Sequence, residues 1–242
     1  MTARRILLAL LLGLASAPPA RALVAEISQR EIAVTTGFTG AELLVFGAKD
    51  SVPVDVIVTV RGPVTPVVVR QRTRIAGIWL TSASATFETA PGFYALASTR
   101  PLADLLPEAE RMRLRLGLDA LPLRAEGPRA SPEFREALIG LKSASGLYRQ
   151  DERAVAVTGE RLFIARVFLP PTVVPGPYRV EVLGVQDRRI VAARDIGLTV
   201  RRVGTSADIW RFAHDHPWLY GFAAVLAAAL VGWAGSVLFR RG

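Results

Sequence analysis

The sequence predicts a mainly β protein: an immunoglobulin-like antiparallel sandwich with a small helical insertion, followed by one C-terminal transmembrane helix. Three observations lead to this fold class. Short β-rich runs, separated by turn residues, recur about every ten residues, which is typical of a sandwich. One central segment has helical periodicity. The stretch from Trp218 to Phe239 is 22 residues long and has no charged side chain.

The first half of the body is predicted to form strands because β-branched residues cluster between turn signals. Asp55 to Val60 is strongly β-branched, and Gly62-Pro63 with Pro66 separates it from the next run, Val67 to Arg72. The other strands expected here are Leu23 to Ile27, Glu31 to Thr36, Ala41 to Phe46, Ile75 to Leu80, and one around Phe93 to Ala97.

A helical insertion is expected at about residues 101–145. Ser131 is a favourable N-cap for a helix that begins at Pro132, since proline suits the first helical position. An earlier helix is predicted over Pro107 to Leu116, with Gly117 as its stop. We expect these helices to cap one edge or end of the sheets. The apolar stripe of the second helix, at i, i+3, i+4 and i+7, consists of Phe134, Ala137, Leu138 and Leu141.

The second half returns to strands, with breaks at Pro170-Pro171, Pro175-Gly176-Pro177 and Gln186-Asp187. Whether the two β-rich halves form one sandwich or two is open at this point, and one domain over residues 23–203 is the favoured interpretation. The predicted strands are Ala154 to Val157, Leu162 to Leu169, Tyr178 to Leu183 and Ile190 to Arg202.

The N-terminus has the pattern of a secretory signal peptide over residues 1–22. Arg4 and Arg5 precede an apolar run of about ten residues, which is too short to span a bilayer. Ala20-Arg21-Ala22 is a small-x-small cleavage site, so cleavage after Ala22 is expected. An uncleaved signal anchor is the alternative.

The C-terminus predicts a membrane anchor over residues 218–239, preceded by a juxtamembrane linker or helix over 204–217. A helix of 22 residues spans roughly 33 Å, enough to cross the hydrocarbon core of a bilayer. Arg240 and Arg241 would lie in a cytoplasmic tail, residues 240–242, as the positive-inside rule prefers. With an exported body, this predicts a single-pass protein of the bacterial inner membrane, its bulk in the periplasm.

Small residues form a stripe along this anchor, which would permit close packing against another helix in lipid. The alternative is that small residues are simply common in membrane helices. The candidate packing residues are Gly221, Ala224, Ala228, Gly232 and Gly235.

The charge does not indicate a nucleic-acid partner. The chain has a net charge of +9, but 25 basic and 21 acidic residues remain once the five arginines of the two ends are set aside. Arg70, Arg72 and Arg74 alternate in a predicted strand and would share one face. They are candidates for binding an anion or acidic headgroups. The alternative is that they simply form a solvent-exposed face of the strand.

No catalytic motif is recognisable, so we expect no enzyme activity and no cofactor. There is no cysteine, which excludes thiol chemistry and thiolate metal sites. His214 and His216 flank Asp215, but alternate positions on a helix point about 200° apart, so we expect a polar interfacial collar and no metal site.

Two segments resemble an alphaproteobacterial family of transmembrane proteins of unknown function. They are RIAGIWLTSASATFETAPGFYALASTRPL, from Arg74 to Leu102, and WRFAHDHPWLYGFAAVLAAALVGW, from Trp210 to Trp233. The resemblance covers essentially the whole mature chain. It implies a signal peptide, a β-rich exported body and one C-terminal helix, and an accessory role beside sulfite-type anion exporters of the multi-spanning permease class. It supplies no catalytic residues.

The sequence therefore predicts a non-enzymatic, membrane-anchored periplasmic accessory protein that assembles with a membrane partner, with such a permease as the partner implied. The alternatives are a periplasmic anion-binding module that uses the arginine strand and a purely structural envelope protein.

Overall fold

The computed structural model describes residues 23–49, 54–75, 77–127, 131–159, 161–204 and 213–239. Side-chain exposure is described for these residues except Ile75 and residues 234–239. The predicted signal peptide (1–22) and tail (240–242) lie outside the described residues, as do residues 205–212 of the juxtamembrane linker.

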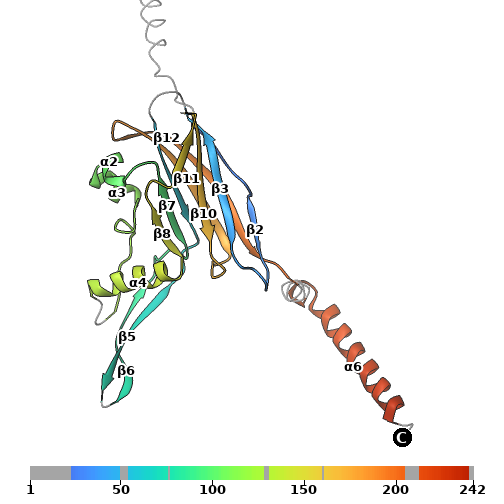
Figure 1. Ribbon diagram of the computed structural model, residues 1–242. Helices are drawn as coiled ribbons and strands as arrows, with labels where there is room; N and C mark the ends of the chain where they lie inside the picture. The colour runs from blue at the N-terminus through green and yellow to red at the C-terminus, as the bar shows by residue number, and fades with distance from the viewer. Residues whose placement is uncertain are drawn as a thin grey trace, which may run out of the picture.

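Two sheets make up the body of the described chain (Figure 1). The four-stranded sheet has the order β1-β3-β10-β9 and the six-stranded sheet the order β2-β12-β11-β4-β7-β8. The strands of the first are β1 (Val24–Ile27), β3 (Ala41–Ala48), β9 (Val155–Thr158) and β10 (Leu162–Leu169). Those of the second are β2 (Glu31–Val34), β4 (Asp55–Arg61), β7 (Tyr94–Ser98), β8 (Tyr148–Asp151), β11 (Gly176–Gln186) and β12 (Arg189–Arg202).

Strands from both halves of the sequence pair within each sheet. β3 pairs with β10, and β4 pairs with β11, both antiparallel. Buried residues of both sheets belong to one hydrophobic cluster. The alternation of β10 explains this, because Phe163, Ala165 and Val167 face the core while the residues between them are exposed.

The expectation of an antiparallel sandwich needs one correction. β2 pairs with β12 in parallel, and β7 pairs with β8 in parallel, so the six-stranded sheet is mixed. Parallel neighbours need a long connection between the end of one strand and the start of the next. The helical insertion provides that connection between β7 and β8. The mainly β class is confirmed, whereas the immunoglobulin-like type is not.

The helical insertion consists of α2 (Leu102–Leu105), α3 (Glu108–Leu114) and α4 (Pro132–Ala144). α4 begins at the predicted proline and packs near the edge strand β8. The segment around α3 instead covers the outer face of the six-stranded sheet. Arg61 Nη2 on β4 donates to the carbonyl of Leu114 at 3.0 Å. The central strands β4 and β7 are consequently buried on both faces. The expectation that the insertion caps an edge or end fits α4 beside β8, but the chain that follows α3 lies against the outer face of β4 and β7, through Arg115 and Gly117.

Tyr94 on β7 fixes the chain that follows α3. Its hydroxyl accepts a hydrogen bond from the Gly117 amide at 2.8 Å, and the contact is buried. Gly117 has a φ of +107°, a conformation that glycine adopts without strain. The predicted stop at Gly117 is two residues late, because α3 ends at Leu114 and Arg115 is its left-handed C-cap, with a φ of +57°. Burial raises the pKa of Tyr94 to about 12, although the Gly117 hydrogen bond acts in the opposite direction.

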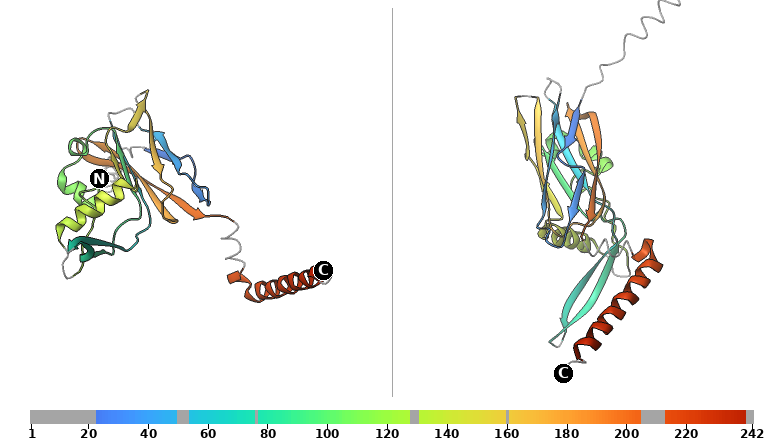
Figure 2. Two further views of the ribbon diagram at one scale, coloured as in Figure 1. Left: turned by 60° about the horizontal axis from the view of Figure 1, so that its bottom comes forward. Right: turned by 90° about the vertical axis from the view of Figure 1, so that its right-hand side faces the viewer.

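A two-stranded hairpin projects beyond the two sheets, formed by β5 (Val67–Ile75) and β6 (Ile78–Phe87) (Figures 1 and 2). The sequence predicted shorter strands here, and it did not predict α2 or β8. The exposed outer part of the hairpin lacks the apolar alternation that identifies a half-buried strand.

The helix α6 (Pro217–Phe239) begins at the proline that the sequence placed next to the anchor. Within the described chain, no helix is both long enough and apolar enough to cross a membrane. The transmembrane span over 218–239 therefore stays a prediction.

We expect Tyr94→Phe to lower the free energy of unfolding by about 1–3 kcal/mol, because the buried Gly117 amide would lose its hydrogen-bond partner. Thermal unfolding of the full chain in detergent measures this. Tyr220→Phe is the matched control, since that tyrosine is exposed on α6. Equal stability of the two variants would contradict a structural role for the Tyr94 hydroxyl.

Candidate functional site

An open groove separates α4 from β5. Phe134 and Leu138 of the predicted stripe are buried, as amphipathic periodicity requires, but Leu141 is 63 % exposed. The groove has a volume of about 450 Å³. Its lining consists of Val69, Arg70, Gln71, Glu133, Phe134, Ala137, Gly140 and Leu141.

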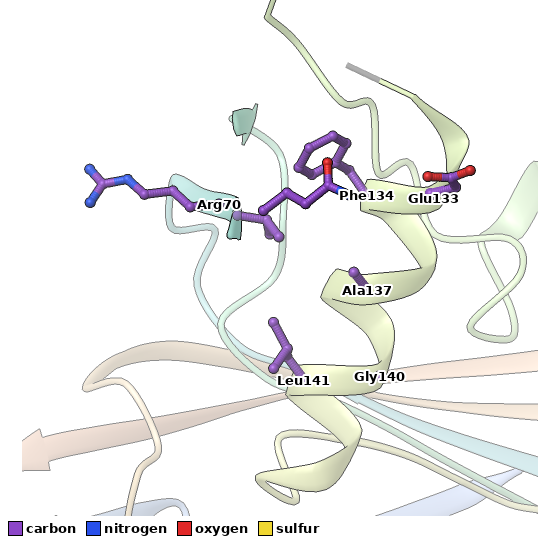
Figure 3. Close-up of a pocket in the computed structure, with 8 residues that line it drawn as sticks. Arg70, Glu133, Phe134, Ala137, Gly140 and Leu141 are labelled. Atoms are coloured by element: carbon purple, nitrogen blue, oxygen red, sulfur yellow. The ribbon is translucent and has the colours of Figure 1, made fainter. Parts of the chain in front are cut away.

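The groove walls are mainly apolar. In Figure 3, Phe134, Ala137 and Leu141 point from α4 toward β5, whereas the guanidinium of Arg70 points away from the helix. The carboxylate of Glu133 lies on the other side of α4. This arrangement suits an apolar group, and it places no charged head at the groove's centre.

The structure places Arg70, Arg72 and Arg74 on β5, where all three are exposed. Arg74 Nε donates to the carbonyl of Gly77 in the hairpin turn at 3.3 Å. Arg70 and Arg72 form no ion pair with any side chain in the described part of the protein. Alternate residues of a strand lie roughly 6.6 Å apart along the backbone, so the three arginines form a row along β5, with a register shift of the strand pair between Gln71 and Arg72. Anion binding by this row stays a prediction.

The outer face of the four-stranded sheet is a feature that the sequence analysis missed. Phe46, Ile164 and Phe168 on this face are 43 %, 38 % and 45 % exposed, and Phe46 pairs directly with Ile164. The signal was present in β10, whose outward positions include Leu162, Ile164 and Phe168 as well as one arginine. We call Phe46, Leu162, Ile164 and Phe168 the outer apolar patch.

The small-residue stripe keeps its helical register in α6. A Cβ atom built at Gly221 or at Gly232 would meet no atom within 4 Å, so the described chain leaves these positions open. Ala224 and Ala228 are exposed between them, and Gly235 lies beyond the side chains that are described. Packing of another helix against this stripe stays a prediction.

A polar cavity of about 480 Å³ lies at the end of the body near Lys49, Asp55, Arg100 and Arg188. The carboxylate of Asp55 forms an ion pair with Arg100 and accepts a hydrogen bond from Thr99 Oγ1 at 2.8 Å. Burial acts to raise the pKa of Asp55, but the hydrogen bonds from Arg100 and Thr99 and the charge of Arg100 outweigh it, so the pKa lies below its usual value. Asp55 and Arg100 pair with each other, and Lys49 Nζ donates to the Val54 carbonyl at 2.7 Å, which favours a structural role for these three residues.

In the described segments, no cluster of three or more His, Asp or Glu side chains could hold a metal ion. His214 and His216 lie just before α6, in the segment that the sequence interpreted as a polar collar.

We expect Asp55→Asn to destabilise the protein by about 1 kcal/mol at neutral pH, a value already discounted because Arg100 is more than half exposed. The folded pKa of Asp55 is depressed, so its contribution is present above the unfolded pKa and is lost as pH falls through the folded pKa. The variant and the wild-type protein should therefore have the same free energy of unfolding below about pH 4.

Unfolding titrations across this pH range test the Asp55 prediction. Asp151→Asn is the control, because that carboxylate belongs to a more exposed ion pair with Arg149 and should matter less. A destabilisation by Asp55→Asn that is the same at about pH 3 as at neutral pH would contradict the assigned role of the charge.

Comparison with known proteins gives a family but no characterised relative. No curated protein matches the chain. The family model described as "Putative transmembrane protein (Alph_Pro_TM)" matches residues 22–241, which include every strand and helix named above. The chain thus belongs to this transmembrane protein family, in agreement with the resemblance of its hairpin and C-terminal segments.

Proposed function

We propose that this protein is a non-enzymatic accessory protein anchored in the bacterial inner membrane, with its β-rich body in the periplasm and its C-terminus in the cytoplasm. Membership of a transmembrane family supports the membrane location. The uncharged run from Trp218 to Phe239 coincides with the helix α6 and supports its assignment as the anchor. Arg240 and Arg241 support the orientation.

The observation that carries the accessory role is the unequal covering of the two sheets. The protein's own helical insertion buries the outer side of β4 and β7. The outer apolar patch on the four-stranded sheet has no such cover in the described chain. Phe46, Leu162 and Ile164 lie together, and Arg166, which forms an ion pair with Glu42, separates them from Phe168. Exposed apolar side chains grouped beside polar ones mark a surface where another protein binds. The paired Phe46 and Ile164 lie at its centre.

A multi-spanning anion permease of the sulfite-exporter type is the partner we propose. This choice comes from the family resemblance, and the short linker between β12 and α6 supports contact with a membrane-embedded protein. Residues 203–216 separate the two elements, so the body stays close to the bilayer.

The topology is tested by single cysteines, because the natural chain has none. We expect Thr158→Cys, on an exposed strand, to react with a membrane-impermeant maleimide added from the periplasmic side. Gly242→Cys should react only after the inner membrane is lysed. Labelling of both positions from the same side would contradict a single span by α6.

A crosslinked pull-down from native membranes, read by mass spectrometry, tests the partner. We expect the wild-type protein to recover a multi-spanning permease and Ile164→Thr to reduce that recovery at least about fivefold, since a polar group in the patch centre forfeits roughly 1 kcal/mol or more. Threonine keeps the β-branched shape that a strand favours.

Met112→Gln is the matched control for the pull-down, because it makes the same kind of apolar-to-polar change at an exposed position of α3. Equal recovery by Ile164→Thr and Met112→Gln would remove the patch from the proposal. Recovery of the protein alone in every sample would contradict the accessory role. It would then favour the anion-binding module, which calorimetry of the full chain with sulfite, sulfate and thiosulfate would test.

A further inference from the structure

The β5–β6 hairpin is fixed at its base and free along the rest of its length. Val69 and Ala85 are buried near the base. Thr86 exchanges two backbone hydrogen bonds with Glu126, at 2.8 and 2.9 Å, which hold β6 to the insertion. From Arg70 outward the side chains of β5 that are described are exposed. About 20 Å of two-stranded ribbon therefore extends past the sheets (Figure 1).

The tip of this hairpin carries three consecutive exposed apolar side chains. Ile78, Trp79 and Leu80 are 65 %, 64 % and 49 % exposed. Register places Trp79 directly opposite Arg74 and Leu80 opposite Thr73, so apolar groups occupy both faces of the ribbon. An isolated two-stranded hairpin is marginally stable in water, and exposing these groups adds no stability to it. Exposed apolar side chains of this kind are typical of a surface that another molecule or a membrane covers when the protein functions.

The charge of the hairpin has one sign. Residues 64–87 include Arg70, Arg72 and Arg74 and contain no aspartate or glutamate. Arg72 and Arg70 follow the apolar tip toward the base at alternate positions of β5, with a register shift of the strand pair between Gln71 and Arg72. Arg74 lies within the tip, opposite Trp79. Two arginines behind an apolar tip with tryptophan match the order of layers at an anionic bilayer surface, where acyl chains lie beneath phosphates. The long side chain of Arg74 can extend from the level of Trp79 back to the phosphates.

The hairpin leaves the body at the same end as the chain that leads to α6. Gly176 packs against Pro63, which precedes β5, so closely that a Cβ there would lie 2.9 Å from the proline ring. Gly176 pairs with Val200, near the end of β12. The base of the hairpin and the exit of β12 therefore share one end of the body. Both the hairpin and α6 extend from that end in Figures 1 and 2.

We propose that the tip of the β5–β6 hairpin, Ile78 to Leu80, inserts into the periplasmic leaflet of the bilayer in which α6 is anchored, and that Arg70, Arg72 and Arg74 bind its anionic phospholipid headgroups. This inference rests on the proposed function for the place of the membrane, but it needs no protein partner. It gives the body a second attachment beside α6, so that the body is oriented on the membrane surface.

The test measures how deep individual residues lie in proteoliposomes of the purified full chain. The vesicles contain phosphatidylethanolamine and phosphatidylglycerol, with a quencher attached to the acyl chains, and no other protein. An environment-sensitive fluorophore is attached to Ile78→Cys, to Thr158→Cys or to Ala228→Cys in separate samples. Thr158 lies at the opposite end of the body, where β4 begins. Its pairing partner Leu162 also pairs with Ala48 of β3. The next residue, Lys49, donates from its side-chain amine to the carbonyl of Val54, just before the first residue of β4.

We expect the label at position 78 to be quenched at least threefold more than the label at position 158. Adding Trp79→Ser and Leu80→Ser to Ile78→Cys should bring its quenching to the level of position 158. Replacing the three arginines by glutamine, or phosphatidylglycerol by phosphatidylcholine, should reduce it at least twofold, because charge attraction to the surface is lost.

The label at position 228 separates this inference from the proposed anchor. Quenching at 228 with none at 78 would overturn the hairpin's insertion and leave the anchor intact. Absence of quenching at both positions would overturn both proposals. If position 78 is unquenched in these vesicles but becomes protected from reagents in native membranes, the tip binds a protein, and the lipid proposal is wrong.

Discussion

The pairing of β4 with β11 is the constraint on which the rest of the structure depends. Residues about 120 positions apart along the chain lie side by side here, and Arg61 Nη1 bridges the two strands to Glu181 at 2.8 Å. The same guanidinium reaches the carbonyl of Leu114, so one side chain ties both strands to the insertion. Because β4 is buried on both faces, the sheet needs that insertion to exclude water from its outer side.

This constraint gives the molecule two unlike sides and two unlike ends. The insertion covers one sheet, and the outer apolar patch lies on the other, where Phe46 and Ile164 pair. At one end, Asp55 and Arg100 satisfy each other in a polar cavity. At the opposite end the hairpin and the exit of β12 are neighbours through Pro63 and Gly176. A body with such polarity fits a surface rather than free solution, since apolar groups are concentrated where a membrane or a partner can cover them.

Local patterns in the sequence predicted the elements whose environment repeats regularly. β10 was predicted with its observed bounds, Leu162 to Leu169, and α4 from Pro132, because alternation and an N-terminal proline are encoded within a few residues. The parallel pair β7–β8 could not be predicted, since it depends on where the chain returns after the insertion. The arginine row was found, but its place on a projecting hairpin depends on packing at Val69 that no local pattern encodes.

The geometry of the arginine row also distinguishes between the two ligands that its charge suggests. A small anion is held best by donors that converge in a pocket from which water is excluded, and Arg70 points away from the groove beside it (Figure 3). Three exposed arginines whose backbone positions lie at roughly 6.6 Å intervals each meet bulk water and screening salt. A bilayer instead offers a plane of phosphates against which separate heads bind without converging. The exposed Trp79, opposite Arg74, is unexplained by a soluble anion, whereas a tryptophan at a lipid interface gains from its position.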